Sequence, residues 1–129
     1  MIDHVGFSVS DIDKSRAFYD AALKPLGLSV LMEATPDQTE SGGTAIGYGK
    51  DSAAFFWIAD NERVGEGTHV AFSADRRADV DAFHAAALAA GGRDNGAPGL
   101  RPNYGPDYYA AFVHDPEGAN IEAVCRAVQ

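Results

Sequence analysis

Hydrophobic positions near the start of this chain follow two periods in succession. Residues 3–9 alternate between apolar and small or polar side chains and are rich in β-formers, which predicts a strand. Over residues 12–26 the apolar side chains recur three and four positions apart, as on one face of a helix. Ser10 with Asp13 resembles a capping box at its start, and Gly27 marks its end. The pattern predicts a strand followed by a helix.

The same pattern returns 65 residues later. HVGFSV at 4–9 matches HVAFSA at 69–74, and the ungapped alignment of residues 4–27 with 69–92 has ten identities in 24 positions. Two unrelated strand–helix units rich in Val, Phe and Ala also resemble one another. The matched histidines and the equal distance to a helix-ending glycine favour an internal duplication instead.

Shorter alternating runs follow each helix. They span residues 28–34, 44–49 and 53–59 in the first half, and 107–114 and 119–125 in the second, with a weaker run near 93–97. Composition predicts loops over 37–43 and 95–106. Each half therefore reads as strand–helix–strand–strand–strand. Neither half buries its sheet face alone, so we expect one α+β domain over residues 1–129, with module 1 at 1–60 and module 2 at 67–129.

Strand alternation separates the histidines from the bulky apolar side chains. Val5 and Phe7 share one face of the first strand, whereas His4 lies on the other face beside small residues. His69 is placed in the same way in the repeat. We expect the apolar faces to pack on the helices and the histidine faces to leave room for a ligand. Taken singly, either histidine also fits an ordinary strand position.

A tight turn at HDPEGAN (114–120) predicts a hairpin between the last two strands. If Asp115 to Gly118 form a type I turn, Ala111 lies opposite Glu122 and Tyr109 lies near it on the same face. Glu122 stands alone between apolar neighbours in its strand. Such a glutamate is either exposed to solvent at an outer face or lines a cavity as a ligand or general base.

Charge and composition limit the classes of partner and the cellular compartment that we expect for this chain. The net charge of −9 argues against nucleic acid and anionic membrane surfaces as partners. No apolar run approaches the roughly 20 residues that span a bilayer, and the N-terminal segment lacks the pattern of a signal peptide. The single cysteine, Cys125, forms no internal disulfide and fits a reducing compartment. We therefore expect a cytoplasmic protein.

Three stretches together carry a family resemblance: the paired histidine openings, SRAFYDAALKPLGL (15–28) and DPEGANIEAV (115–124). In them the sequence resembles the vicinal oxygen chelate (VOC) superfamily of glyoxalases, bleomycin-resistance proteins and dioxygenases. The resemblance implies two pseudo-symmetric βαβββ modules forming a half-open barrel, often around a divalent metal ion. Carried over residue by residue, it implies His4, His69 and Glu122 as metal ligands. Trp57 stands where a glyoxalase I usually has a fourth ligand, and an indole does not bind a divalent metal.

A set of two histidines and one carboxylate suits zinc, iron, manganese or nickel. The resemblance thus implies a metal-dependent enzyme, glyoxalase-like (lactoylglutathione lyase-like) or dioxygenase-like, that chelates adjacent oxygens of a small metabolite or xenobiotic. Glu122 and Tyr109 are the candidate catalytic groups. The candidate pocket residues are Trp57, Phe55, Ala111, Arg101 and Tyr104. Tyr108 lies beside the loop predicted over 95–106. The alternative is a non-catalytic, drug-sequestering protein of the bleomycin-resistance type. By resemblance we also expect a homodimer.

Overall fold

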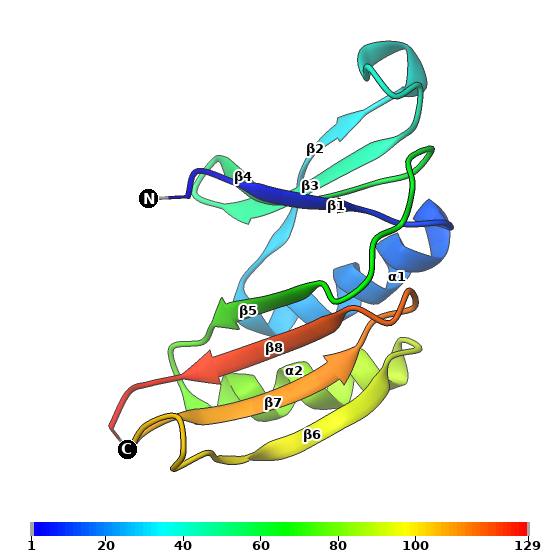
Figure 1. Cartoon of the computed structure of the whole chain (residues 1–129). Coiled ribbons are helices and arrows are strands. Elements are labelled where there is room, and N and C mark those ends of the chain that lie inside the picture. The colour runs from blue at the N-terminus through cyan, green and yellow to red at the C-terminus, as the bar shows by residue number, and fades with distance from the viewer. Residues whose placement is uncertain (1, 129) are drawn as a thin grey trace.

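Two four-stranded sheets of the same topology form the framework of the protein (Figure 1). The structure is a computed structural model and describes residues 2–128. In the first sheet the strand order is β1 (Val5–Ser8), β4 (Ala53–Ala59), β3 (Ala45–Lys50) and β2 (Ser29–Ala34). In the second it is β5 (His69–Ser73), β8 (Asn120–Cys125), β7 (Tyr109–His114) and β6 (Arg93–Leu100). The first strand of each half pairs in parallel with the last, and all other pairs are antiparallel.

One long helix follows the first strand of each half. Helix α1 spans Ile12–Leu23 and α2 spans Arg77–Ala89, with short 3-10 turns η1 at Lys24–Leu26 and η2 at Pro36–Gln38. Adding 65 to the bounds of α1 gives residues 77–88, which fall within α2. Each helix packs on its own sheet, and the two helices also contact each other. The α+β fold with two βαβββ units, expected from the sequence, is confirmed. None of the described helices is both long and apolar enough to cross a membrane.

The helix-packed faces of the two sheets share one apolar core. Phe56 of β4 and Phe72 of β5 meet edge to face with ring centroids 5.0 Å apart, so aromatic packing is continuous from one half to the other. Phe18, Tyr19 and Phe83 of the helices are completely buried in the same core. The opposite face of each sheet, here called its outer face, carries no helix.

Polar contacts, one of them buried, join the β7–β8 turn to the first half. The Tyr19 hydroxyl of α1 donates a hydrogen bond to Asp115 Oδ2 at 2.6 Å. Burial and the neighbouring Asp115 carboxylate raise the pKa of Tyr19 well above its ordinary value. Asp115 Oδ1 accepts hydrogen bonds from the backbone of Glu117 and Ala119, which shapes the turn. The Glu117 carboxylate accepts hydrogen bonds from the backbone and hydroxyl of Ser10, just before α1.

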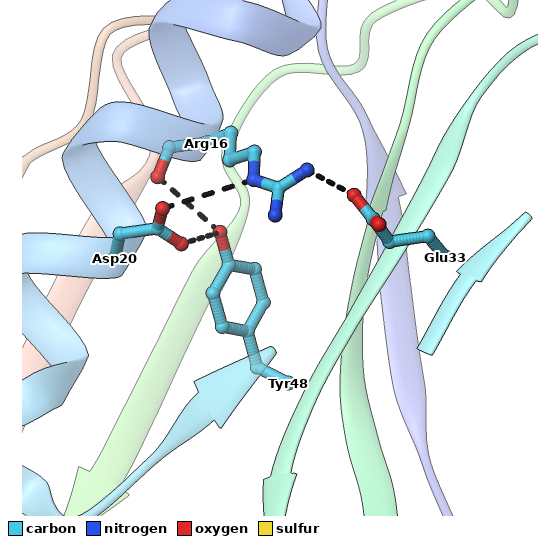
Figure 2. A network of polar contacts seen from close by, with 4 residues as sticks. All are labelled: Arg16, Asp20, Glu33 and Tyr48. Atoms are coloured by element: carbon cyan, nitrogen blue, oxygen red, sulfur yellow. Dashed lines mark hydrogen bonds and ion pairs between the residues drawn. The ribbon is translucent and has the colours of Figure 1, made fainter. Parts of the chain in front are cut away.

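A second polar network ties α1 to β2 and β3, as Figure 2 shows. The Arg16 guanidinium contacts the Glu33 carboxylate and lies 3.7 Å from Asp20 Oδ2. The Tyr48 hydroxyl donates to Asp20 Oδ1 at 3.0 Å. The charged groups are partly open to solvent, where such pairs contribute at most about 1 kcal/mol. We assign this network a structural role.

Two local predictions are corrected by the structure. Asp11, not Ser10, caps α1, because its carboxylate accepts a hydrogen bond from Lys14 N at 3.1 Å. Residues 95–100, expected to lie in a loop, belong to β6. This strand has irregular pairing around Gly96 and lies at the edge of its sheet, where glycine and proline are tolerated.

Candidate functional site

A buried carboxylate and a half-exposed imidazole meet on the outer face of the second sheet. Glu122 on β8 is only 2% exposed, and its Oε1 lies 3.0 Å from Nε2 of His69 on β5. The His69 side chain remains 47% exposed. The parallel pairing places Ala71 opposite Glu122, so strand alternation keeps His69 on the same face. A buried carboxylate is costly without hydrogen-bond donors, and His69 supplies one.

Tyr108 supplies the second donor. Its hydroxyl donates to Glu122 Oε2, so each carboxylate oxygen has its own partner. Burial raises the pKa of Tyr108 to about 12, and the hydrogen bond to the Glu122 carboxylate adds to this effect. The phenol therefore remains protonated near neutral pH and holds the carboxylate in place.

An open hollow surrounds these groups. We call it the sheet hollow; its volume is about 670 Å³, and it is lined by His69, Asn103, Tyr104, Tyr108, Phe112, Asn120, Glu122 and Arg126. The Arg126 guanidinium carbon lies 4.8 Å from the Tyr108 ring centroid. The Tyr104 ring meets Tyr108 edge to face at 5.3 Å. The hollow thus has aromatic walls and contains the Arg126 cation and the Glu122 carboxylate that pairs with His69.

The hairpin register differs by one residue from the sequence-based prediction. Phe112 lies opposite Glu122, and Ala111 lies opposite Ala123. The reason is the turn: Asp115 N donates to Ala119 O, and Gly118 has a left-handed φ of 89°, so residues 116–118 form a three-residue loop. A shift of one residue moves every side chain of a strand to the other face.

Tyr109 and Ala111 were therefore assigned to the wrong face. Tyr109 lies opposite Cys125 on the helix-packed side, and its hydroxyl donates to Asp81 of α2 at 2.6 Å. The Arg77 guanidinium carbon lies 5.2 Å from its ring centroid. Ala111 is completely buried in the core. Neither residue lines the sheet hollow, and Tyr108 occupies the place predicted for Tyr109.

His4 does not join this pair within the chain. Its Nδ1 lies 2.8 Å from Asp3 Oδ1, and its side chain is 59% exposed beside the first sheet. Among residues 2–128, no group of three or more His, Cys, Asp or Glu side chains is positioned to hold a metal ion. One chain therefore brings together two of the three proposed ligands, His69 and Glu122.

Trp57 lies on the outer face of the first sheet. It pairs with Gly6 on β1 and with Gly47 on β3. A Cβ atom added to Gly47 would lie 2.8 Å from two indole ring carbons, so the missing side chain makes room for the ring. The offset of 65 relates Trp57 to Glu122 and Gly47 to Phe112. At these matched positions the first sheet has an indole on β4 beside a glycine on β3, whereas the second sheet has a carboxylate on β8 beside a phenyl ring on β7.

The other predicted pocket residues are divided between two places. Tyr104 lines the sheet hollow. The Arg101 guanidinium carbon lies 5.4 Å from the Phe112 ring centroid, and the group donates to the backbone oxygens of Gly99 and Ala97. Phe55, in contrast, lines a separate apolar cavity of about 300 Å³ between the two sheets.

Comparison with known proteins decides the family. The profile described as "Glyoxalase/Bleomycin resistance protein/Dioxygenase superfamily" matches residues 1–123. The chain belongs to this superfamily. It is similar to a glyoxalase/bleomycin resistance protein from Albidiferax ferrireducens T118, with 32% identity and a TM-score of 0.78 over 98% of this chain and 99% of that one. No curated protein matches significantly.

More distant members of the superfamily share the fold. Glyoxalase I from Zea mays is 23% identical with a TM-score of 0.73, covering 99% of this chain but only 45% of that one. The present chain thus spans about half the length of the maize enzyme. A glyoxylase/bleomycin resistance protein/dioxygenase domain from Frankia sp. EAN1pec is 16% identical with a TM-score of 0.71, covering 97% and 96% of the two chains. At such identities the likeness shows the fold alone.

Three lining residues of this superfamily member were missing from the sequence-based predictions: Asn103, Phe112 and Arg126. Arg126 follows β8 four positions after Glu122, so strand alternation continued past Cys125 would have placed it on the same side. Phe112 was lost through the register error alone. Asn103 lies in the loop between β6 and β7, and no periodic pattern marks it.

Proposed function

We propose that this chain is an enzyme that acts on a small molecule in the sheet hollow, with Glu122 as the central reactive or metal-binding group. The observation that supports this most directly is the pairing of a buried carboxylate with a solvent-accessible imidazole at 3.0 Å inside an open hollow. Buried ionisable groups with specific partners are concentrated at functional sites. Within the superfamily, this arrangement favours a glyoxalase-like or dioxygenase-like reaction on a small metabolite or xenobiotic.

The donor chemistry suits a divalent metal, but one chain supplies too few donors. An imidazole nitrogen and a carboxylate oxygen are ligands for zinc, iron, manganese or nickel. Catalytic sites for such ions usually have three protein ligands, and His69 with Glu122 gives two. A bound metal would supply Lewis-acid stabilisation of the charge on a chelated substrate oxygen. We therefore propose that His4 completes the set from a second copy of the chain.

A symmetric homodimer provides a simple route for this. His4 directly precedes β1 of the first sheet and is exposed, and His69 and Glu122 lie on the outer face of the second sheet. A two-fold axis that sets the first sheet of one copy over the second sheet of its partner creates two equal sites. Each site then combines His4 and Trp57 of one copy with His69, Tyr108 and Glu122 of the other.

The chain's own residues have distinct roles in this proposal. Tyr108 fixes one oxygen of Glu122 through its hydroxyl hydrogen bond. The other oxygen faces His69, where it can bind a metal ion or take a proton from a bound substrate. Trp57 contributes an apolar wall that carries no metal-binding atom.

Metal analysis of purified protein tests the proposal. Protein produced in medium containing zinc, iron, manganese and nickel is expected to retain about one transition-metal ion per chain. His69→Ala and Glu122→Gln are each expected to abolish retention, whereas the control His84→Ala removes a histidine of α2 that pairs with Asp94 instead. Wild-type protein that retains no metal under these conditions would contradict the metal-dependent proposal.

One observation favours the second candidate, a non-catalytic binding protein. Both oxygens of Glu122 already have protein donors, so the buried carboxylate is satisfied without a metal. A protein of this kind would bind its ligand with no transition metal, and Glu122→Gln would then change ligand affinity without any change in metal content.

A further inference from the structure

We propose that the sheet hollow recognises a small aromatic acid, with the ring held by the Tyr104, Tyr108 and Phe112 side chains and the acidic group bound by Arg126. This inference rests on the proposed function only in taking the hollow as the ligand site. It adds the chemical class of the ligand and names the residue that selects it.

Arg126 is the cation that faces the hollow. Its guanidinium carbon lies 4.8 Å from the Tyr108 ring centroid, so the group rests on an aromatic side chain that lines the hollow, and Arg126 itself is exposed. No ion pair joins Arg126 to any residue within 2–128. A guanidinium presents five N–H donors in a planar fork that matches a carboxylate. Arg126 therefore packs on Tyr108 and, among residues 2–128, has no carboxylate partner that neutralises it.

Arg126 is the group in the hollow that attracts an anion. The whole chain has a net charge of −9, which opposes an acidic ligand at long range. Inside the hollow, however, the one carboxylate is Glu122, and both of its oxygens accept hydrogen bonds from His69 and Tyr108. The remaining polar side chains, Asn103 and Asn120, are neutral. The local attraction for an anion is therefore concentrated on one arginine.

The walls of the hollow favour an aromatic ring. Tyr104 is 60% exposed and meets Tyr108 edge to face at 5.3 Å, which leaves ring surface open to the hollow. The ring centroids of Phe112 and His69 lie 6.4 Å apart, so an aromatic side chain also lies beside the His69–Glu122 pair. Rings that stack or meet edge to face attract each other more strongly than their buried area alone provides. An aliphatic acid would forgo this part of the contact.

The volume is consistent with a small ligand. About 670 Å³ lies in the range of roughly 300–1,000 Å³ found for small-molecule sites. A single aromatic ring that carries one carboxylate fits this space with room for a second substituent toward His69 and Glu122. The acid would then sit at Arg126 and the opposite end of the ring at the reactive pair.

The test uses three probes of similar size: benzoate, benzamide and cyclohexanecarboxylate. Binding to the full chain is followed by amide NMR titration, before and after chelation with EDTA, because a bound metal also attracts carboxylates. We expect benzoate to bind at least about tenfold more tightly than benzamide and about threefold more tightly than cyclohexanecarboxylate. We expect Arg126→Gln to remove the preference for benzoate over benzamide. The control Arg63→Gln makes the same charge change in the connector between the halves and should leave the preference intact.

Equal binding of benzoate and benzamide, an unchanged preference in Arg126→Gln, or no binding of benzoate would each overturn the inference. Metal content measured on the same samples separates this test from that of the proposed function. A metal-free protein with an Arg126-dependent preference for benzoate would contradict the metal-dependent function and support this inference. A metal-bound protein with no preference for the acid would contradict this inference alone.

Discussion

The Tyr108 hydroxyl donates a hydrogen bond to Oε2 of the buried Glu122, while the neighbouring Tyr109 points to the opposite side of the sheet and reaches Asp81. The side chains of two adjacent tyrosines thus lie on opposite faces of the second sheet. The three-residue loop at 116–118 determines which one meets Glu122, because it sets the register of β7 against β8. A local turn therefore decides the polar environment of the proposed reactive group.

The raised pKa of Tyr108 gives the first prediction. We expect its phenol to titrate at about 12, because burial and the Glu122 carboxylate disfavour the phenolate. The folded pKa lies above the unfolded value of about 10, so this contribution to stability is complete below pH 10 and is lost as the pH rises through the folded value. Glu122→Gln should lower the Tyr108 pKa. Tyrosine-ring carbon NMR, assigned with Tyr108→Phe, measures it; a titration near 10 in the wild type would disprove the hydrogen bond.

The contact between Tyr19 and Asp115 gives a prediction on stability. Tyr19→Phe keeps the buried ring but removes a 2.6 Å hydrogen bond between the two halves. We expect the free energy of unfolding in urea to fall by about 1–3 kcal/mol, since Asp115 Oδ2 loses its donor in the interior. Tyr104→Phe, which removes an exposed hydroxyl, is the matched control and should change it by less than about 0.5 kcal/mol. Equal effects of the two variants would show that the buried bond contributes nothing.

The link between Ser10 and Glu117 predicts a pH-dependent stability. Hydrogen bonds from the Ser10 hydroxyl and backbone lower the pKa of Glu117. Because the folded pKa lies below the unfolded value of about 4.3, the stabilisation is present above that pH and is lost as the pH falls through the folded value.

Ser10→Ala should therefore be less stable than the wild type near pH 7, by at most about 1 kcal/mol for this partly exposed contact. The difference should vanish in strong acid, as urea unfolding across pH 2–7 would measure. Ser29→Ala, at an exposed position at the start of β2, should show no such trend. A difference for Ser10→Ala that stays constant with pH would refute the role of the carboxylate.

The close packing of the Trp57 indole against Gly47 can be tested by tryptophan fluorescence. Gly47→Ala would place a methyl group 2.8 Å from two carbons of the indole, so the ring must move. We expect a shift of the fluorescence maximum, which reports on the single tryptophan of the chain, and a loss of about 1–3 kcal/mol in stability. Gly65→Ala has open space around the added methyl and should leave both quantities unchanged. An unchanged spectrum in Gly47→Ala would mean that the indole does not rest on Gly47.

Much of the fold could be predicted from the sequence because the same strand–helix pattern occurs in both halves. The matched openings at His4 and His69 and the equal spacing to Gly27 and Gly92 fixed the order of elements in both halves. Strand β6 was missed beyond residue 97 because its glycines and Pro98 read as loop composition. Their backbone is held by pairing with β7, which is a long-range effect that local propensity does not contain.

The site was predicted less well, and for two physical reasons. The turn at 115–119 contains a left-handed Gly118 that adds one residue to the loop, so a prediction of a tighter turn exchanged Tyr108 for Tyr109. Arrangement in space was the second reason. The repeat identified His4 and His69 as equivalent positions, but equivalence within two modules does not bring two side chains together, and in one chain only His69 meets Glu122.

The most direct test mixes two variants that should each have lost the metal. His4→Ala and His69→Ala are refolded together from denaturant, and metal content is measured per chain. If His4 of one copy serves the His69 and Glu122 of its partner, each mixed dimer contains one intact site, and the mixture should regain about a quarter of the wild-type metal content. A mixture that binds no more metal than the two variants measured separately would contradict a site shared between copies.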